Sequence, residues 1–221
     1  LASDFILSTF VTIVFALLLN EIKNKFMKRS IQTIVYLPNF LSWVILATVV
    51  VNIFSYEGPI NAVLEMLGIE PILFMASNKW FRSVLIVTDV WKGFGYGAII
   101  YLAALSGIDP GLYEAAAIDG ANRFKRVWHI TLPGILPTIM LVTIMNLPNV
   151  LNAGFDQIFN LYNPLVMETA DIIDTWVYRV GLVERQYSLG TAVGLLRSIV
   201  GIILMLSANK IAQKVTDYRI F

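Results

Sequence analysis

The chain is 221 residues long, with 57% hydrophobic residues, 14% charged residues and a formal net charge of +1. Globular proteins carry about 25% charged residues, so this composition excludes an ordinary water-soluble domain and indicates a protein embedded in lipid. The near-neutral charge offers no basic surface for nucleic acid. The absence of cysteine excludes thiol chemistry, and His129 is the single histidine. We therefore expect no catalytic site, no metal site and no cofactor bound by this chain.

Five apolar segments approach the roughly 20 residues that a helix needs to cross a membrane. Because helices satisfy their own backbone hydrogen bonds in lipid, the predicted fold is all-α. It is a polytopic membrane helix bundle that forms a single domain over residues 1–221. The predicted spans are residues 5–19, 31–54, 84–105, 135–155 and 189–208.

The chain begins Leu1-Ala2-Ser3-Asp4, without an initiator methionine, and the first span is short. We therefore expect a longer protein with a further segment upstream. The start carries neither a basic region nor a small-residue cleavage site, which argues against a cleavable signal peptide.

Basic and acidic residues alternate between the loops. Loops rich in lysine and arginine stay in the cytoplasm, which predicts an external N-terminus and a cytoplasmic C-terminus. The basic residues lie in the loops 21–30 and 107–133 and in the tail, and are Lys23, Lys25, Lys28, Arg29, Arg123, Lys125, Arg126, Lys210, Lys214 and Arg219.

The cytoplasmic loop 106–133 is predicted to form two short helices. Asp109 and Pro110 are typical of the start of a helix, and Gly120 permits the sharp turn that follows it. The second helix is predicted to begin at Asn122 and to end near Leu132, before Pro133 breaks it. One face carries small side chains that let a partner protein approach closely; it is formed by Tyr113, Ala116 and Ala117. The alternative is an amphipathic loop lying on the membrane surface.

The same loop contains the pattern E-A-A, three residues, G, nine residues, I, one residue, L-P. With the stretches 34–40, 101–110 and 151–164, it makes the chain resemble the permease subunits of binding-protein-dependent ABC importers. The likeness is to their maltose-type carbohydrate branch, especially to oligosaccharide and oligouronide permeases of the alginate or pectin-fragment type. It covers essentially the whole chain, except that a leading transmembrane helix usual in the family is absent. The motif residues are Glu114, Ala115, Ala116, Gly120, Ile130, Leu132 and Pro133.

The resemblance implies a type I importer core in which this loop is the coupling-helix hairpin, seated in a groove of the ATP-hydrolysing subunit. Glu114 would bond to that subunit, Ala115 and Ala116 would allow close approach, Asp119 would share the surface, and Gly120 would form the turn. The implied partners are a homologous but different permease chain, two ATP-binding subunits that use ATP and Mg, and an extracytoplasmic solute-binding protein. The chain has no G-x-x-x-x-G-K-[ST] pattern of its own. The implied location is a bacterial inner membrane.

Polar residues recur around the end of the fourth span, at steps of three and four that share one face if the helix persists. Amides and a carboxylate suit sugar hydroxyls, and neighbouring aromatic rings suit sugar rings. Helix-to-helix packing is the alternative, and the nearby prolines, Pro148 and Pro164, can scatter the face. The polar residues are Asn149, Asn152, Asp156, Asn160 and Asn163, with Gln157 beside them, and the aromatic residues are Phe155, Phe159 and Tyr162.

Charged residues inside the spans are candidates for the substrate pathway, because ionisable groups at membrane depth are costly. Asp89 and Lys92 lie three residues apart in the third span and can instead neutralise each other. Arg197 lies deeper in the last span, where it either faces the cavity or bonds a carboxylate on another helix, such as Asp89. Lys92 and Arg197 would attract an anionic uronide.

We therefore expect a membrane subunit of an ATP-driven importer that forms half of the pathway for a carbohydrate. A permease of the same architecture for another small solute, such as an amino acid, is the nearest alternative. An ion-driven secondary carrier is a second alternative, although it would not need a docking hairpin. An intramembrane enzyme is disfavoured, because the sequence offers no cysteine nucleophile, histidine pair or metal signature.

Overall fold

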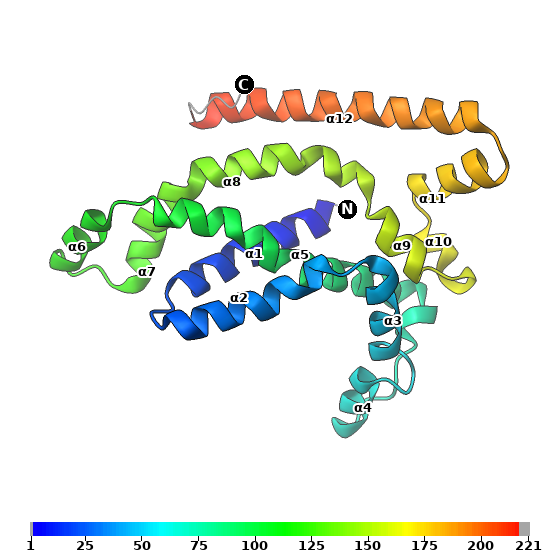
Figure 1. Cartoon of the computed structure of the whole chain (residues 1–221), viewed down its shortest axis with the longest axis horizontal. Coiled ribbons are helices and arrows are strands. Elements are labelled where there is room, and N and C mark those ends of the chain that lie inside the picture. Colours follow the sequence, from blue (N-terminus) through cyan, green and yellow to red (C-terminus); the bar gives the residue numbers. More distant parts are fainter. Residues whose placement is uncertain (1, 217–221) are drawn as a thin grey trace.

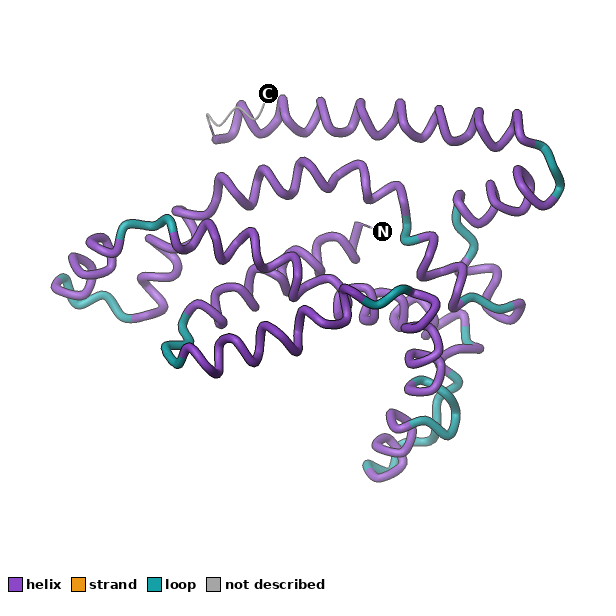
Figure 2. The backbone as a smooth tube through the Cα atoms, in the orientation of Figure 1, coloured by secondary structure: helices purple, strands orange, loops and turns teal. Residues whose placement is uncertain are grey.

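A computed structural model describes residues 2–216, with the side chains of 4–151 and 153–210. All regular structure in this range is helical (Figure 1, Figure 2). The α-helices are α1 Ala2–Asn20, α2 Lys25–Phe40, α3 Trp43–Ile53, α4 Pro59–Met66, α5 Asn78–Ser106, α6 Pro110–Ile118, α7 Arg123–Arg126, α8 Leu132–Asn146, α9 Phe155–Leu161, α10 Met167–Ala170, α11 Ile173–Val177 and α12 Tyr187–Thr216. Short 3₁₀ or π turns lie at η1 Phe74–Ala76, η2 Val127–Thr131, η3 Leu147–Asn152, η4 Pro164–Val166 and η5 Tyr178–Val183.

The long helices lie along one another and the short helices gather at the ends of the bundle. In Figure 1, α6 and α7 lie at one end, whereas α9, α10 and α11 lie at the other. Three helical segments in the described part of the chain are long and apolar enough to cross a membrane: Asn78–Ser106, Arg123–Leu151 and Tyr187–Lys210. The helix at Asp4–Asn20 is apolar but shorter.

The second predicted span differs from the structure. Residues 31–54 were expected to form one continuous helix, but they fall on α2 and α3, whose axes are bent by 106°. Leu41 is extended (φ −84°, ψ 138°), and the Ser42 hydroxyl accepts a hydrogen bond from the Ile45 amide at 3.4 Å to start α3. As a result α3 leaves the bundle sideways (Figure 1).

The fourth predicted span also ends differently. It was expected to reach residue 155, but the helical run that starts at Arg123 ends in η3. Ala153 (φ 42°) and Gly154 (φ 71°) then take left-handed conformations, and Phe155 begins the separate helix α9. A left-handed pair cannot continue a right-handed helix, so the chain turns here.

Two buried clusters hold the bundle. One joins α1, α5 and α8 through Ala16, Ala98, Tyr101, Leu105 and Ile135. The other lies towards the opposite end, where α3, α9 and α10 pack on α5, and is formed by Ala47, Val50, Phe74, Phe81, Val84, Leu161, Val166 and Ala170.

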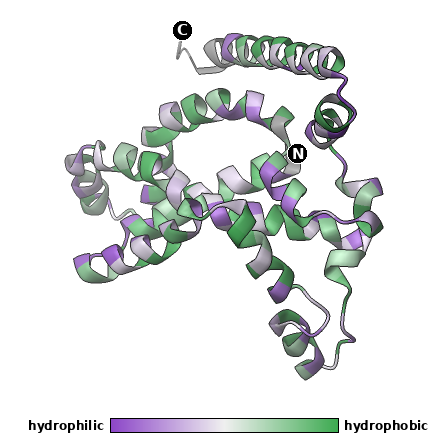
Figure 3. Cartoon of the chain, turned by 45° about the vertical axis from the view of Figure 1, so that its right-hand side comes forward, coloured by the Kyte–Doolittle hydropathy of each residue, from purple (hydrophilic) through white to green (hydrophobic). Residues whose placement is uncertain are grey.

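Apolar side chains also cover much of the outside. Hydrophobic residues dominate the long helices in Figure 3, and in α12 the side chains of Ile199 and Ile203 are 57% and 56% exposed. A soluble monomer rarely exposes contiguous apolar surface of this extent, whereas lipid accommodates it without cost.

Gly95 allows α2 and α5 to pack closely against each other. A Cβ atom added there would lie 2.5 Å from both the carbonyl oxygen and the Cγ1 atom of Val35. Because one of those atoms belongs to the backbone of α2, the helix itself would have to move.

We predict that Gly95→Ala lowers the stability of the protein by about 1–3 kcal/mol, the usual cost of overpacking. Gly194→Ala in α12 is the matched control, since a Cβ atom there meets nothing within 4 Å. Thermal unfolding of the detergent-solubilised protein measures both. Equal midpoints for the two variants would contradict the close approach.

Candidate functional site

The loop between α5 and α8 is a capped helical hairpin. Asp109 Oδ1 accepts a hydrogen bond from the Gly111 amide at 2.9 Å, and Asn122 Oδ1 accepts one from the Lys125 amide at 2.9 Å. Gly120 has φ +74°. The two predicted helix starts and the glycine turn are thus present.

Two hydrogen bonds close the hairpin. The Tyr113 and Thr131 hydroxyl oxygens lie 2.9 Å apart, and Arg126 Nε donates to the Ala121 carbonyl at 3.1 Å. Tyr113 was expected on the docking face with Ala116 and Ala117, but its ring reaches back to the second arm. The hairpin is therefore braced internally and can move as a unit.

Pro133 does not break the second arm, contrary to the sequence prediction. The helix passes from α7 through the π turn η2 directly into α8, where Pro133 lies in the first turn. In η2 the Leu132 amide bonds to the Val127 carbonyl, five residues back. This wider turn accommodates the missing amide of the proline, so the hairpin is continuous with a membrane span.

The tip of the hairpin is exposed and partly apolar. Ile118 and Phe124 are 87% and 83% exposed. Apolar side chains of this exposure, away from the apolar spans, indicate a surface that another protein covers. Of the motif residues, Glu114, Ala115, Asp119, Gly120 and Pro133 are exposed, whereas Ala116, Ile130 and Leu132 are partly buried.

A cleft of about 740 Å³ opens at the opposite end of the bundle, and we call it the outer cleft. It lies between α9, α11, η5 and α12, with Trp43 of α3 in its wall. Asp174 of α11 forms an ion pair with Arg197 of α12 there, and Asp156 is exposed beside them. Arg197 therefore bonds a carboxylate on another helix, and that partner is Asp174 rather than Asp89.

The aromatic residues expected to stack on sugar rings stack mainly on one another. The rings of Phe155 and Phe159 are 5.2 Å apart, and Tyr178 meets Phe159 edge to face at 4.8 Å. Tyr162 lies 6.0 Å from Phe159. Of the three expected residues, Phe155 alone lines the outer cleft, where Trp43, Tyr178 and Tyr187 supply the other aromatic rings.

A second cleft, of about 330 Å³, lies between α1, α5 and the end of α8, and we call it the inner cleft. Its wall carries several polar side chains among apolar ones. Gly154 and Gln157 also line the outer cleft, so the two clefts adjoin. The polar lining residues are Asp4, Ser8, Thr9, Thr12, Asp89, Tyr101, Asn146, Asn149 and Gln157.

The predicted polar face around the fourth span is scattered by the turn at residues 153 and 154. Asn149 donates to Asn146 Oδ1 at 3.1 Å in the inner cleft. Asn160 donates to the Asp156 carbonyl at 2.7 Å within α9, and Asn163 donates to the Met75 carbonyl at 2.8 Å. The side chain of Asn152 lies outside the described residues.

Gln157 fastens α9 to α5. It is 4% exposed, and its Nε2 donates to the Leu85 carbonyl at 2.7 Å and to the Thr88 hydroxyl at 2.9 Å. The Gln157 amide therefore joins two helices, which is the packing role that the sequence analysis gave as the alternative to substrate binding.

Lys92 lies outside both cleft linings. Its ammonium group donates to the carbonyls of Pro38, Asn39 and Leu41 at 3.3, 3.0 and 2.7 Å. These are carbonyls at the end of α2, so the contact is with backbone rather than with Asp89. Sequence periodicity cannot predict this contact, because Lys92 and the carbonyls that it binds lie some fifty residues apart in the chain.

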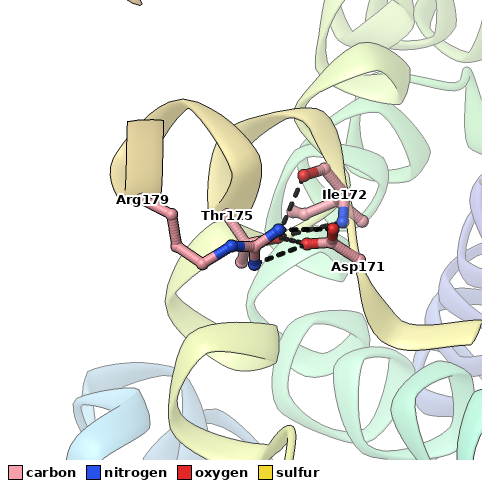
Figure 4. A network of polar contacts seen from close by, with 4 residues as sticks. All are labelled: Asp171, Ile172, Thr175 and Arg179. Carbon is pink, nitrogen blue, oxygen red and sulfur yellow. Dashed lines mark hydrogen bonds and ion pairs between the residues drawn. The ribbon is translucent and has the colours of Figure 1, made fainter. Parts of the chain in front are cut away.

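A further ion pair joins Asp171, which follows α10, to Arg179 in η5 (Figure 4). Arg179 holds both carboxylate oxygens of Asp171, at 2.9 and 2.6 Å, and the Thr175 hydroxyl lies 2.6 Å from Asp171 Oδ1. The guanidinium hydrogen bonds are the main reason that the pKa of Asp171 lies below its usual value. The loop beside the outer cleft is thereby kept in one conformation.

The family model described as the binding-protein-dependent transport system inner membrane component matches residues 8–217, and the chain belongs to this family. It is 44% identical over 210 residues to protein LplB of Bacillus subtilis (strain 168), with 95% of this chain and 66% of that protein covered. It is 41% identical over 212 residues to the polygalacturonan/rhamnogalacturonan transport system permease protein YteP of the same strain, with 96% and 66% covered. The chain thus spans slightly less than two thirds of the length of these curated relatives.

A solved structure shares the fold. It is a bacterial alginate ABC transporter in complex with an alginate pentasaccharide-bound periplasmic protein, and one of its chains is 36% identical to this one. The TM-score is 0.90, with 99% of this chain and 79% of that chain covered. The all-α membrane bundle and the inner-membrane location predicted from the sequence are confirmed, and the family to which the chain belongs is a transport-system component.

We predict that Arg197→Met lowers stability more than the double variant Arg197→Met/Asp174→Asn. The single change leaves Asp174 charged and unpaired, which costs about 3–5 kcal/mol at a fully buried site and less here, because the two side chains are 28% and 21% exposed. Thermal unfolding of the wild type, the two single variants and the double variant gives the coupling energy. Strictly additive losses would show that the pair contributes nothing.

Proposed function

We propose that this chain is the membrane-spanning subunit of an ATP-driven oligosaccharide importer and forms half of its translocation pathway. The observation that carries the proposal is the exposed, braced hairpin at the end of the bundle opposite the outer cleft. Its partners are a second, homologous permease chain, two ATP-binding subunits and an extracytoplasmic solute-binding protein. ATP and Mg are used by the ATP-binding subunits.

The hairpin is suited to act as a lever. Both arms are continuous or nearly continuous with membrane spans: Gly107 ends α5 just before Asp109 caps α6, and α7 runs through η2 into α8. Force applied at the exposed tip therefore passes to two helices. Within this surface, Glu114 bonds the ATP-binding subunit, and Ala115 and Ala116 permit its close approach. The remaining members of the coupling set are Asp119, Gly120, Ile130, Leu132 and Pro133.

The two adjoining clefts are proposed as the substrate path. Gly154 and Gln157 border both, so a flexible chain of sugars can pass from the outer cleft to the inner one. Hydroxyl, amide and carboxylate side chains there supply the donors and acceptors that sugar hydroxyls require. The proposed pathway residues are thus Asn149 in the inner cleft, Asp156 in the outer cleft and Gln157 between them. Asn152 and Asn160, which lie near these residues in the chain, are also proposed as pathway residues.

The substrate class is an oligosaccharide, and the similarity to the polygalacturonan/rhamnogalacturonan permease and to the alginate transporter supports fragments of acidic polysaccharides. The two cations that the sequence singled out for a uronate are both engaged by other groups. Arg197 is paired with Asp174, and the ammonium of Lys92 is engaged by three carbonyls. Recognition of a uronate carboxylate is therefore assigned to the second permease chain or to the binding protein.

We predict that Glu114→Lys and Gly120→Val abolish most substrate-stimulated ATP hydrolysis while the chain still inserts and folds. The first change reverses the charge at the docking surface, and the second puts a β-branched residue at φ +74°. The measurement is ATPase activity of the reconstituted complex, with co-purification of the ATP-binding subunits as a second readout.

Glu21→Lys is the matched control, because Glu21 is an exposed acid in the other cytoplasmic loop. It should leave stimulation unchanged. Full stimulation and normal subunit binding in both hairpin variants would refute the coupling role.

We predict that Asn149→Leu and Asp156→Ala each reduce uptake of labelled oligosaccharide several-fold, because each removes a polar partner from one cleft. Thr33→Val is the control, since Thr33 is exposed on α2 outside both cleft linings. Uptake by proteoliposomes loaded with ATP measures the effect. Wild-type kinetics in both cleft variants would mean that these side chains serve packing alone, and uptake driven by an ion gradient without ATP would indicate a secondary carrier.

A further inference from the structure

The bend between α2 and α3 has no sufficient cause in its own sequence. Residues 31–54 are apolar enough to predict one continuous span, yet the axes diverge by 106° at Leu41 and Ser42. Pro38 disturbs the turn before itself, because its ring meets the carbonyl four residues back. The break lies after Pro38, so another group must hold it.

Lys92 supplies that group from α5. A helix end leaves its last carbonyls without the amide partners of a continuing helix. Here the Pro38 carbonyl accepts the Leu41 amide at 3.2 Å, so the ammonium is an additional donor for it. The three carbonyls that the ammonium reaches, those of Pro38, Asn39 and Leu41, are 3.3, 3.0 and 2.7 Å from Nζ. An ammonium group has three N–H donors, which match this set.

The same ammonium also meets the first residue of α3. Nζ lies 5.7 Å from the centre of the Trp43 ring, within the range of a cation–π contact. Trp43 in turn lines the outer cleft. One side chain on α5 thus contacts the end of one helix and the start of the next, on both sides of the bend.

We propose that Lys92 is a positioning residue that keeps the chain uncoiled at Leu41 and Ser42, holds α3 at its angle and so fixes Trp43 in the wall of the outer cleft. Without the ammonium, the cheapest way to pair the carbonyls of α2 is to continue the helix through Leu41 and Ser42. The expected result of its loss is a straighter α2–α3 segment.

The test is a distance measured by pulsed electron paramagnetic resonance in the full protein, purified with its partner subunits. The chain contains no cysteine, so Thr33→Cys and Asn52→Cys, both at exposed positions, carry the only spin labels on it. Helix geometry gives about 17 Å between these backbone positions at the 106° bend and about 28 Å in a straight helix. Lys92→Met, which matches lysine in length without its donors, should shift the distance from the short towards the long value.

A second substitution should reverse the shift. Ser42 has φ −67° and ψ 153°, and Leu41 before it is extended, so proline fits position 42 in the bent chain. Proline at 42 disfavours a continuous helix, because it has no amide hydrogen and its ring meets the carbonyl four residues back, that of Pro38. Ser42→Pro alone should leave the short distance, and Lys92→Met/Ser42→Pro should restore it.

Two comparisons complete the design. Lys79→Met is the matched control at the outer end of α5, since Lys79 contacts only the Trp80 ring, at 5.6 Å from its centre, among the interactions described for it. Lys92→Arg keeps charge and donors and should retain most of the short distance. A short distance in Lys92→Met, or a long one that Ser42→Pro fails to shorten, overturns the proposal.

Function gives an independent readout. If the outer cleft receives substrate, Lys92→Met should raise several-fold the concentration of loaded binding protein that half-maximally stimulates ATP hydrolysis. Basal hydrolysis should stay unchanged, and Ser42→Pro should restore the wild-type value. Because this arm rests on the proposed function and the distance arm does not, a shifted distance with unchanged stimulation would count against the proposed function alone.

Discussion

In a membrane every backbone carbonyl and amide must find a partner within the protein, and this constraint shapes the whole chain. It explains why all regular structure in the described residues is helical and why polar side chains pair with backbone carbonyls where helices end or meet. Where α2 ends, the Lys92 ammonium donates hydrogen bonds to the carbonyls there. Where α9 meets α5, Gln157 reaches a carbonyl and a hydroxyl. These polar side chains inside the bundle therefore bind groups of neighbouring helices, mainly backbone carbonyls, before any of their donors is available to a ligand.

The sequence predicts well what depends on local signals. Apolar run length places the spans, and the caps Asp109 and Asn122 with the turn at Gly120 define the hairpin because each acts within three residues. The two errors in the spans have different origins. The end at Ala153 and Gly154 involves a left-handed alanine, which composition does not reveal, and the bend at Ser42 depends on a lysine some fifty residues away.

How far the sequence predicts where candidate residues lie depends on whether they are contiguous in the chain. The coupling motif is contiguous, so its residues come together on one hairpin, with Tyr113 as the exception that braces it. The cleft residues come from separate helices, and spacing along one of them does not indicate what faces it. For Arg197 the sequence left open a position facing the cavity or a carboxylate partner such as Asp89, and Asp174 could not be identified from sequence. The packing role of Gln157 depends on Thr88.

The α5 helix reaches from the hairpin at one end to the outer elements at the other. It leads into α6 inside, and near its outer end it holds α9 through Gln157 and α3 through Lys92. Because α5 is attached to other elements at both ends, we expect a tilt of this helix to move its two ends in opposite directions. In the proposed importer, a tilt imposed on the inner end of α5 by the ATP-binding subunits would move α3 and α9 together at the outer end.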